Sequence, residues 1–321
     1  MPKDKTKTIT SIGGQALMEG IMMRGPKQTS VAVRVPDGSI STDYLETNYL
    51  RDRYPILRKP LLRGIASFIE SMQVGYKALS YSAEKSGMEE EDEEEEPSKF
   101  DQWLTRTFGD KIMNVVMGVG AVLGVVLAVV LFFLLPTWVC TLLSGAIPAI
   151  GPAGFWRSFA EGVMRIGIFV LYIALVAQMK EIHRVFEYHG AEHKTIFCYE
   201  NEEELTVENV RKYRRFHPRC GTSFMIIMLL LGIIVGIFIP ITQPVLRSIV
   251  KILCLPLVVA IGFELIRICG KYDNTFTRII AAPGLWMQRI TTKEPEDGMI
   301  EVAIDALKAV IPENGEDKIR K

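Results

Sequence analysis

Long apolar runs with few charged side chains dominate residues 112–268. A bilayer core about 30 Å thick requires roughly 20 apolar residues in a helix. The run 112–135 contains no charged residue and stops at Pro136. Three more runs follow at 159–179, 222–239 and 245–268, and the charges of the last lie near its ends, where long side chains can reach an interface. The pattern predicts an integral membrane protein with about four transmembrane helices.

Lys and Arg residues are distributed unevenly between the segments that join these runs. The middle segment, 180–221, contains eight of them, whereas 137–158 contains one and 240–244 contains none. Because basic residues are retained on the cytoplasmic side of a membrane, we expect the middle segment and both termini to be cytoplasmic. The lipid bilayer is therefore the first expected partner of this chain.

Residues 1–87 show shorter patterns. Alternation over 30–35 runs into the turn-forming residues 36–39, which predicts a β-hairpin. Glycines that bracket short apolar stretches in 13–26 predict further strands and tight turns. Over 61–85 apolar residues recur every three or four positions, which predicts an amphipathic helix. Its apolar face would either pack on the strands or lie at the inner membrane surface.

The expected fold is an α-helical polytopic membrane protein with a small N-terminal cytoplasmic β-containing module and amphipathic helices. We expect residues 1–87 to form that module and the acidic segment 88–110 to be a linker, because its eight consecutive acids repel one another. The membrane domain would span 111–270, including the cytoplasmic loop 180–221. Residues 271–321 would form a cytoplasmic tail.

The tail itself contains a turn signal and a helix signal. Residues 282–284 predict a turn before an aromatic amphipathic segment. Asp297 is placed to cap a second helix. The apolar face of that helix consists of Ile300, Ile304, Leu307 and Val310.

Overall charge and composition exclude several function classes. Lys and Arg total 37, as do Asp and Glu, so the chain is not a globally basic nucleic-acid binder and no specific nucleic-acid partner is expected. The five cysteines are scattered, unlike those of a disulfide scaffold. The sequence contains no Walker loop, no dinucleotide-binding glycine pattern and no nucleophile elbow.

The middle segment contains the residues most suited to chemistry. His189 and His193 are four apart, so on a helix both can face one ion. Glu192 precedes the second histidine, which gives the H-x-x-E-H order of inverted zinc proteases. A bound zinc ion would lower the pKa of its water, and Glu192 would act as the catalytic base. The alternative is a hydrogen-bond or ion-pair network at the cytoplasmic lip.

A second cluster could complete the metal shell. His217 and Cys220 lie just before the third apolar run, and both are zinc ligand types. Glu264 is a rival ligand, unless it pairs with Arg267 or another basic residue. Four protein ligands would make a closed structural site for zinc or another divalent metal. Three ligands and a water would make a catalytic site.

Four motifs in order are similar to those of YqhQ-like bacterial membrane proteins. They lie at 13–26, 187–194, 217–223 and 283–289. That family is described as uncharacterised and sometimes as predicted metal-dependent enzymes, so the resemblance implies a bacterial inner-membrane protein. It also draws attention to Glu19 and Arg24, which would either contribute to function or form a salt bridge that fixes the β-strands.

Two hypotheses of function follow. The first is a membrane metal-dependent hydrolase of the zinc type, acting at the cytoplasmic face. The second is a non-enzymatic assembly factor or scaffold that binds a translocon, a ribosome or a membrane-protein partner and uses the His/Cys cluster structurally. A homo-oligomer is a further expectation, because Gly120 and Gly124 offer a small-residue contact on the first apolar helix.

Overall fold

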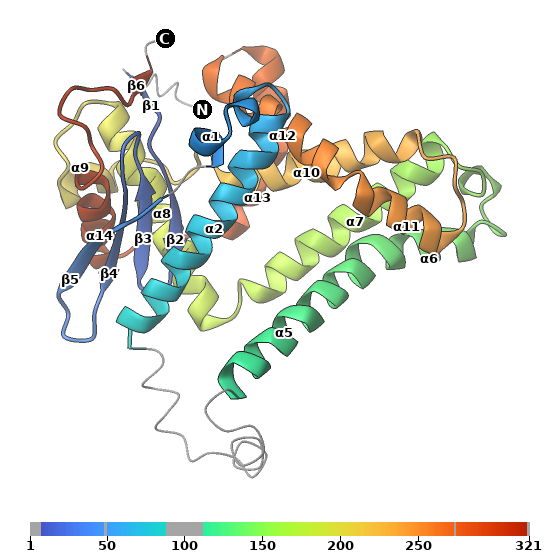
Figure 1. Cartoon of the computed structure of the whole chain (residues 1–321), viewed down its shortest axis with the longest axis horizontal. Helices are drawn as coiled ribbons and strands as arrows, with labels where there is room; N and C mark the ends of the chain where they lie inside the picture. Colours follow the sequence, from blue (N-terminus) through green and yellow to red (C-terminus); the bar gives the residue numbers. More distant parts are fainter. Residues whose placement is uncertain (1–7, 48–49, 88–111, 273, 320–321) are drawn as a thin grey trace. The chain divides into compact units, whose positions relative to one another are not determined.

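The computed structural model describes residues 8–47, 50–87, 112–272 and 274–319 (Figure 1). The chain divides into two compact units. Unit 1 is formed by 1–88, 173–227 and 259–321, and unit 2 by 89–172 and 228–258. The predicted acidic linker at 88–110 lies outside the described residues. Unit 1 thus joins the N-terminal segment to the whole middle segment and the tail.

A four-stranded antiparallel sheet forms the centre of unit 1. Its strands follow in chain order as β2 (Gly13–Leu17), β3 (Gly20–Arg24), β4 (Thr29–Arg34) and β5 (Ile40–Leu45). The predicted hairpin is confirmed, with Arg34 opposite Ile40 and Gly38 at a φ of 85° in the turn. The turn between β2 and β3 places Glu19 at a φ of 48°. A two-stranded sheet pairs β1 (Ile9–Thr10) with β6 (Lys318–Ile319).

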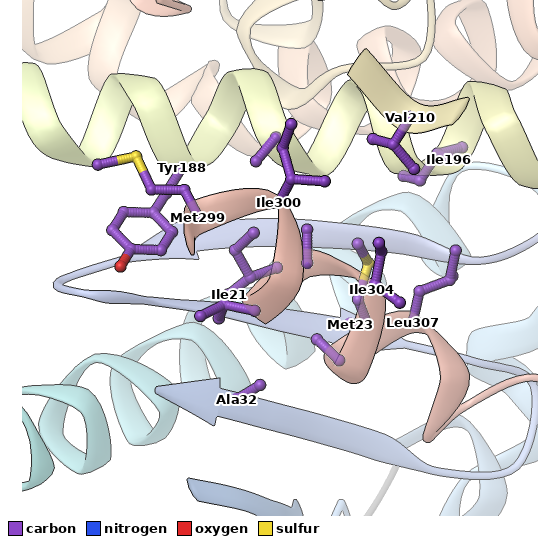
Figure 2. Packing of buried hydrophobic residues seen from close by; sticks show 14 of the residues in the cluster. Ile21, Met23, Ala32, Tyr188, Ile196, Val210, Met299, Ile300, Ile304 and Leu307 are labelled. Atoms are coloured by element: carbon purple, nitrogen blue, oxygen red, sulfur yellow. The ribbon is translucent and has the colours of Figure 1, made fainter. Parts of the chain in front are cut away.

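Helices cover both faces of this sheet, as expected for strands that alternate apolar side chains between two faces. Ile21, Met23 and Ala32 pack with α8 (Lys180–Glu200) and α14 (Asp297–Lys308), as Figure 2 shows. The side chains that alternate with these along the strands point to the other face of the sheet. There they form a second hydrophobic core with Val74 and Ala78 of α2 (Leu62–Lys85). The sheet therefore lies between α2 on one face and α8 with α14 on the other.

The predicted helix at 61–85 is confirmed as α2, but its orientation differs from the ordinary expectation. Met72 and Tyr76 of the apolar stripe are 58% and 71% exposed. The buried face includes short side chains such as Gly75 and Ala78, and a Cβ on Gly75 would lie 2.6 Å from Oε1 of the Gln15 side chain on β2. The prediction that the apolar stripe packs on the strands is therefore wrong, and the stripe is the outward face of α2.

Two details of the tail also differ from expectation. The turn predicted at 282–284 is helical, since α13 (Thr275–Thr291) continues through Pro283. The cap of α14 is Glu296, with Asp297 as the first helical residue. The predicted apolar face of α14 is confirmed, because Ile300 and Leu307 are fully buried.

The remaining helices include most of the apolar runs. They are α1 (Leu50–Arg53), a 3-10 turn at Pro55–Arg58, α5 (Ile112–Val129), a π-helical turn at Val130–Leu134, α6 (Leu135–Leu143), a 3-10 turn at Pro148–Ile150, α7 (Phe155–Val176), α9 (Val207–Arg211), α10 (Gly221–Ile237), α11 (Pro244–Leu253) and α12 (Leu255–Lys271). The second apolar run was predicted as a helix over 159–179. It ends at Val176 instead, and α8 begins at Lys180 after an extended Met179.

Among the described residues, two helices are long and apolar enough to cross a membrane, at 119–143 and 155–176. The pair α11 and α12 bends by 47° and would make a third if it counts as one span. α10 is apolar but has 17 residues. These helices indicate membrane association. Arg247 and Lys251, which were expected to reach an interface, are instead buried in unit 2.

Candidate metal centre

Three of the predicted ligands converge in unit 1. His189 and His193 lie one turn apart on α8, with ring centroids separated by 4.4 Å. Cys220 immediately precedes α10, and its Sγ lies 3.1 Å from Nε2 of His189. One ligand atom from each of the three residues lies within 4.8 Å of the others. The motif at 187–194 and the motif at 217–223 thus meet, as the sequence predicts.

Backbone carbonyls orient both imidazole rings. Nδ1 of His189 donates to the carbonyl of Thr291 at 2.8 Å, and Nδ1 of His193 donates to the carbonyl of Arg215. A carbonyl oxygen only accepts hydrogen bonds, so each Nδ1 bears a proton, and in the neutral form of each ring Nε2 carries the lone pair that a metal needs. Carbonyl acceptors of this kind commonly orient histidine ligands of metals.

The spacing suits a tetrahedral metal. Zinc bonds of the usual lengths place a nitrogen and a sulfur ligand about 3.6 Å apart. The His189–Cys220 distance of 3.1 Å would need to widen by about half an ångström, which one side-chain rotation can supply. The donor set of two imidazoles and a thiol also suits zinc or a similar borderline metal.

Glu192 lies beside these ligands and is 5% exposed. The backbone N–H of Gly14 donates to its carboxylate. A Cβ on Gly14 would lie 3.0 Å from Cδ of Glu192 and 2.7 Å from the carbonyl of Met22, so glycine lets β2 approach α8 this closely. Burial raises the pKa of Glu192, although the two ligand histidines lower it in part. The motif at 13–26 therefore contributes to the site through its backbone.

Two of the three candidate ligands form an opposed pair of charges. Burial acts to raise the pKa of Cys220, but His189 and His193 outweigh it and hold that pKa well below its ordinary value. Burial acts to lower the pKa of His189, but the Cys220 thiolate outweighs it and raises that pKa to about 9. A thiolate and an imidazolium thus face one another until a cation replaces the proton.

His217 lies behind the three ligands and outside their group. Its ring centroid is 5.6 Å from that of His193, and its Nε2 is 3.7 Å from the Glu200 carboxylate. Burial lowers the pKa of His217 to about 4. The side-chain amide of Gln288 on α13 makes two hydrogen bonds with the backbone of His217. Its oxygen accepts from the His217 N–H at 2.7 Å, and its nitrogen donates to the His217 carbonyl at 2.8 Å. The structure thus gives His217 contacts that shape the loop leading to Cys220.

Glu264 also lies apart from the ligands. Its carboxylate accepts from Nε of Arg63 at 2.7 Å, at the start of α2. This matches the alternative in which Glu264 pairs with a basic residue, but the partner is Arg63 and lies two hundred positions away in the sequence. The fourth histidine, His183, is exposed and lies 3.7 Å from Glu187.

Glu19 and Arg24 pair with different helices rather than with each other. The Glu19 carboxylate accepts hydrogen bonds from Nε and Nη2 of Arg184 and from the hydroxyl of Tyr188, both on α8. Arg24 lies 3.7 Å from Glu70 on α2. The two residues fix the sheet to the helices on its opposite faces, so their role in the structure is broader than the predicted local salt bridge.

Sequence reasoning missed the residues that support the centre through the backbone. A Cβ on Gly190 would lie 2.0 Å from the carbonyl of Lys293, so glycine is required where the segment after α13 crosses α8. That crossing delivers the Thr291 carbonyl to His189. Gly284 similarly lets α13 contact Ser223. A glycine inside the H-x-x-E-H motif was the available signal, because an interior glycine that weakens a helix often marks a close approach.

These features define a largely helical protein with membrane-length helices and a buried His/His/Cys group. The chain belongs to the DUF1385 family, described as a protein of unknown function, whose model matches residues 59–313. It is 33% identical over 310 residues to "Uncharacterized protein YqhQ" of Bacillus subtilis (strain 168), covering 96% of this chain and 94% of that relative. The predicted YqhQ-like family is confirmed. No solved structure matches the chain.

Proposed function

We propose that this protein is a membrane-bound, metal-dependent hydrolase of the zinc type. The observation that supports it most is the convergence of His189, His193 and Cys220 beside the buried carboxylate of Glu192. Three protein ligands leave one position of a tetrahedral metal for water, the arrangement of catalytic zinc sites.

The residues divide the chemical work. The metal would lower the pKa of a bound water towards 7. Glu192 would accept the proton of that water and pass it to the leaving group, since a carboxylate with a raised pKa is suited to transfer protons near neutral pH. The Gly14 N–H would hold the carboxylate in place. The carbonyls of Thr291 and Arg215 would keep both imidazoles directed at the metal.

The proposed location is the cytoplasmic face of the bacterial cell membrane. The basic middle segment and the tail favour cytoplasmic placement of the centre and of both termini. In this proposal the four apolar runs insert, with the bent α11–α12 pair and the short α10 as two of the spans. The exposed apolar stripe of α2 would then lie at the inner leaflet. A peptide or a lipid-linked substrate would enter from the membrane boundary.

Metal analysis of matched variants tests this function. We expect one metal ion per wild-type chain, loss of that metal in His193→Ala, and full metal content in Glu192→Gln. X-ray absorption should find two nitrogens, one sulfur and one oxygen around the ion. Glu192→Gln should fail to replace the wild-type gene in cells, whereas the control Glu187→Gln, on the same helix, should succeed. Absence of metal from the wild-type protein would refute the proposal.

A structural site within an assembly factor or scaffold is the second candidate. It is favoured by the proximity of His217, whose ring lies 5.6 Å from His193 and could supply a fourth ligand after a rearrangement. The same absorption spectrum separates the two. Three nitrogens and one sulfur, together with a fully functional Glu192→Gln, would support the scaffold and its protein partner.

A further inference from the structure

The described part of unit 2 gathers its charged residues into one buried cluster. The sequence of 112–172 and 228–258 contains five charged side chains, and each is at most 7% exposed: Arg157, Glu161, Arg165, Arg247 and Lys251. α7 supplies three and α11 supplies two, all at four-residue intervals, so each set lies along one helix face. Burying a charge among apolar residues costs several kcal/mol unless opposite charge compensates it, so charges at such depth are commonly functional.

One carboxylate serves three cations. Glu161 accepts from Nε of Arg157 and from Nε of Arg247, each at 3.1 Å, and from Nζ of Lys251. With Arg165 the cluster has four cations and one anion, which is a formal net charge of +3. The cluster therefore has an excess of positive charge.

Backbone carbonyls compensate two of the cations in part. The acceptors lie mainly where helices and turns end: Gly236, Ile239 and Ile241 for Arg247, and Gly151, Thr137 and Thr242 for Arg157. Unpaired carbonyls at a helix C-terminus carry partial negative charge. Arg157 and Arg247 thus act as clamps on the connecting loops, and their donors are already occupied.

Arg165 is compensated far less. Its Nε donates to the carbonyl of Phe132 at 2.6 Å, and its guanidinium lies 5.1 Å from the centroid of the Phe133 ring. The side chain is 6% exposed, and its Nη2 finds no hydrogen-bond partner among the described residues. A buried guanidinium nitrogen without an acceptor loses its hydration and receives nothing in return.

Arg165 and Lys251 lie against neighbouring turns of α10. A Cβ on Gly232 would be 3.2 Å from Nη1 of Arg165, and a Cβ on Gly236 would be 3.8 Å from Cε of Lys251. The two glycines are four apart, so the Arg165 guanidinium and the Lys251 side chain contact α10 about one helical turn, roughly 5–6 Å, apart. This spacing matches two cations that bind different oxygens of one tetrahedral anion.

We propose that Arg165 and Lys251 bind an oxyanion of the phosphate class within unit 2. The guanidinium offers Nη2 as a directed donor, and the ammonium adds a point charge, which together suit a phosphate group. A bound phosphate accepts a hydrogen bond from Nη2 of Arg165 and reduces the net charge of +3 on the cluster. The site is independent of the metal centre, which lies in unit 1.

The phosphate group can belong to a lipid or to a free ion. An apolar cavity of about 360 Å³ lies beside the loop that joins α10 to α11. Its lining includes Ile239, Ile241, Val250 and Cys254. An acyl chain would occupy such a cavity, whereas inorganic phosphate would leave it unfilled. The experiment therefore has to separate the two sources.

Native mass spectrometry of the full chain in detergent tests the proposal with three probes: inorganic phosphate alone, phosphatidylglycerol, and diacylglycerol as the phosphate-free control. We expect inorganic phosphate, phosphatidylglycerol or both to bind, and diacylglycerol to bind at least tenfold more weakly. Arg165→Gln should weaken the phosphate-bearing probe by roughly tenfold or more, which corresponds to about 1.4 kcal/mol. Arg267→Gln, an exposed arginine on α12, should bind as the wild type does.

Each other outcome decides against the site. If diacylglycerol binds as tightly as phosphatidylglycerol and phosphate does not bind, the cavity alone recruits lipid. If Arg165→Gln binds like the wild type, Arg165 has no role. Should Arg165→Gln fail to fold, Arg165→Lys keeps the charge without the guanidinium, and a severalfold loss of affinity is expected. Unchanged binding in Arg165→Lys would then overturn the proposal. So would the absence of any phosphate-bearing adduct.

Discussion

The two units bury ionisable side chains in opposite ways. In unit 1, backbone carbonyls accept hydrogen bonds from Nδ1 of His189 and His193, so Nε2 of each ring is the atom left to bind a cation. In unit 2, the carboxylate of Glu161 is surrounded by donors, so positive charge is in excess and favours an anion. Backbone carbonyls orient the ligands in unit 1, whereas in unit 2 they only compensate part of the positive charge. The comparison shows that the charge a buried site can accept depends on the balance of its side chains as well as on the main-chain groups around them.

The largest effect is expected from Glu161→Gln. This change removes the carboxylate that compensates three buried cations, so we expect a loss of about 3–5 kcal/mol in the free energy of unfolding. Thermal unfolding of the full chain in detergent measures it, with Glu187→Gln as the control. Addition of Lys251→Met to Glu161→Gln should recover part of the loss. A stability within about 0.5 kcal/mol of the wild type would contradict the assigned role of Glu161.

A smaller effect is expected from Gly190→Ala in unit 1. The new methyl group would meet the Lys293 carbonyl, so the segment after α13 must move away from α8, at a cost of roughly 1–3 kcal/mol. The movement also withdraws the Thr291 carbonyl from His189, so metal affinity should fall roughly tenfold or more. Isothermal titration with zinc measures this. Gly167→Ala on α7, where a Cβ meets nothing within 4 Å, should leave metal affinity unchanged.

The smallest effect concerns protons. Because the pKa of His189 is raised to about 9, this imidazole is charged at pH 7. It must lose its proton to the solvent before it can bind a metal. Calorimetric titrations in buffers of different ionisation enthalpy should therefore show about one proton released from His189 per metal at pH 7. The release should decline as pH rises through 9. In Cys220→Ser the thiolate is absent, so His189 should be largely neutral at pH 7 and the release should fall. Equal release by both proteins would exclude the thiolate–imidazolium pair.

Local patterns predicted local structure well. Alternation over 30–35 and the turn at 36–39 identified the hairpin of β4 and β5, because both signals arise within a few residues. The three- and four-residue spacing over 61–85 identified α2 but not its orientation. Tyr76 faces outward, whereas the neighbouring Gly75 lies against the Gln15 side chain of β2. Periodicity reports which residues share a face, and it does not report what covers that face.

Motif spacing predicted part of the candidate centre for the same reason. His189 and His193 share a helix face by geometry alone, whereas the proximity of Cys220 depends on how the loop before α10 folds. Glu264 has a carboxylate that could bind a metal, yet it forms an ion pair with Arg63. Long-range partners of this kind leave little trace in one sequence, because any basic residue can pair with any acid.

The sequence by itself determined the apolar runs, the strands, the helical spacing of the histidines and the family to which the chain belongs. The tertiary structure alone decided which carbonyls orient the imidazoles, which glycines admit a crossing backbone, and which nitrogen of Arg165 lacks an acceptor among the described residues. The first group follows from covalent neighbours and helix or strand periodicity. The second follows from contacts between different helices, strands and loops, or from the balance of charge in a packed interior, where hydration no longer compensates a mismatch.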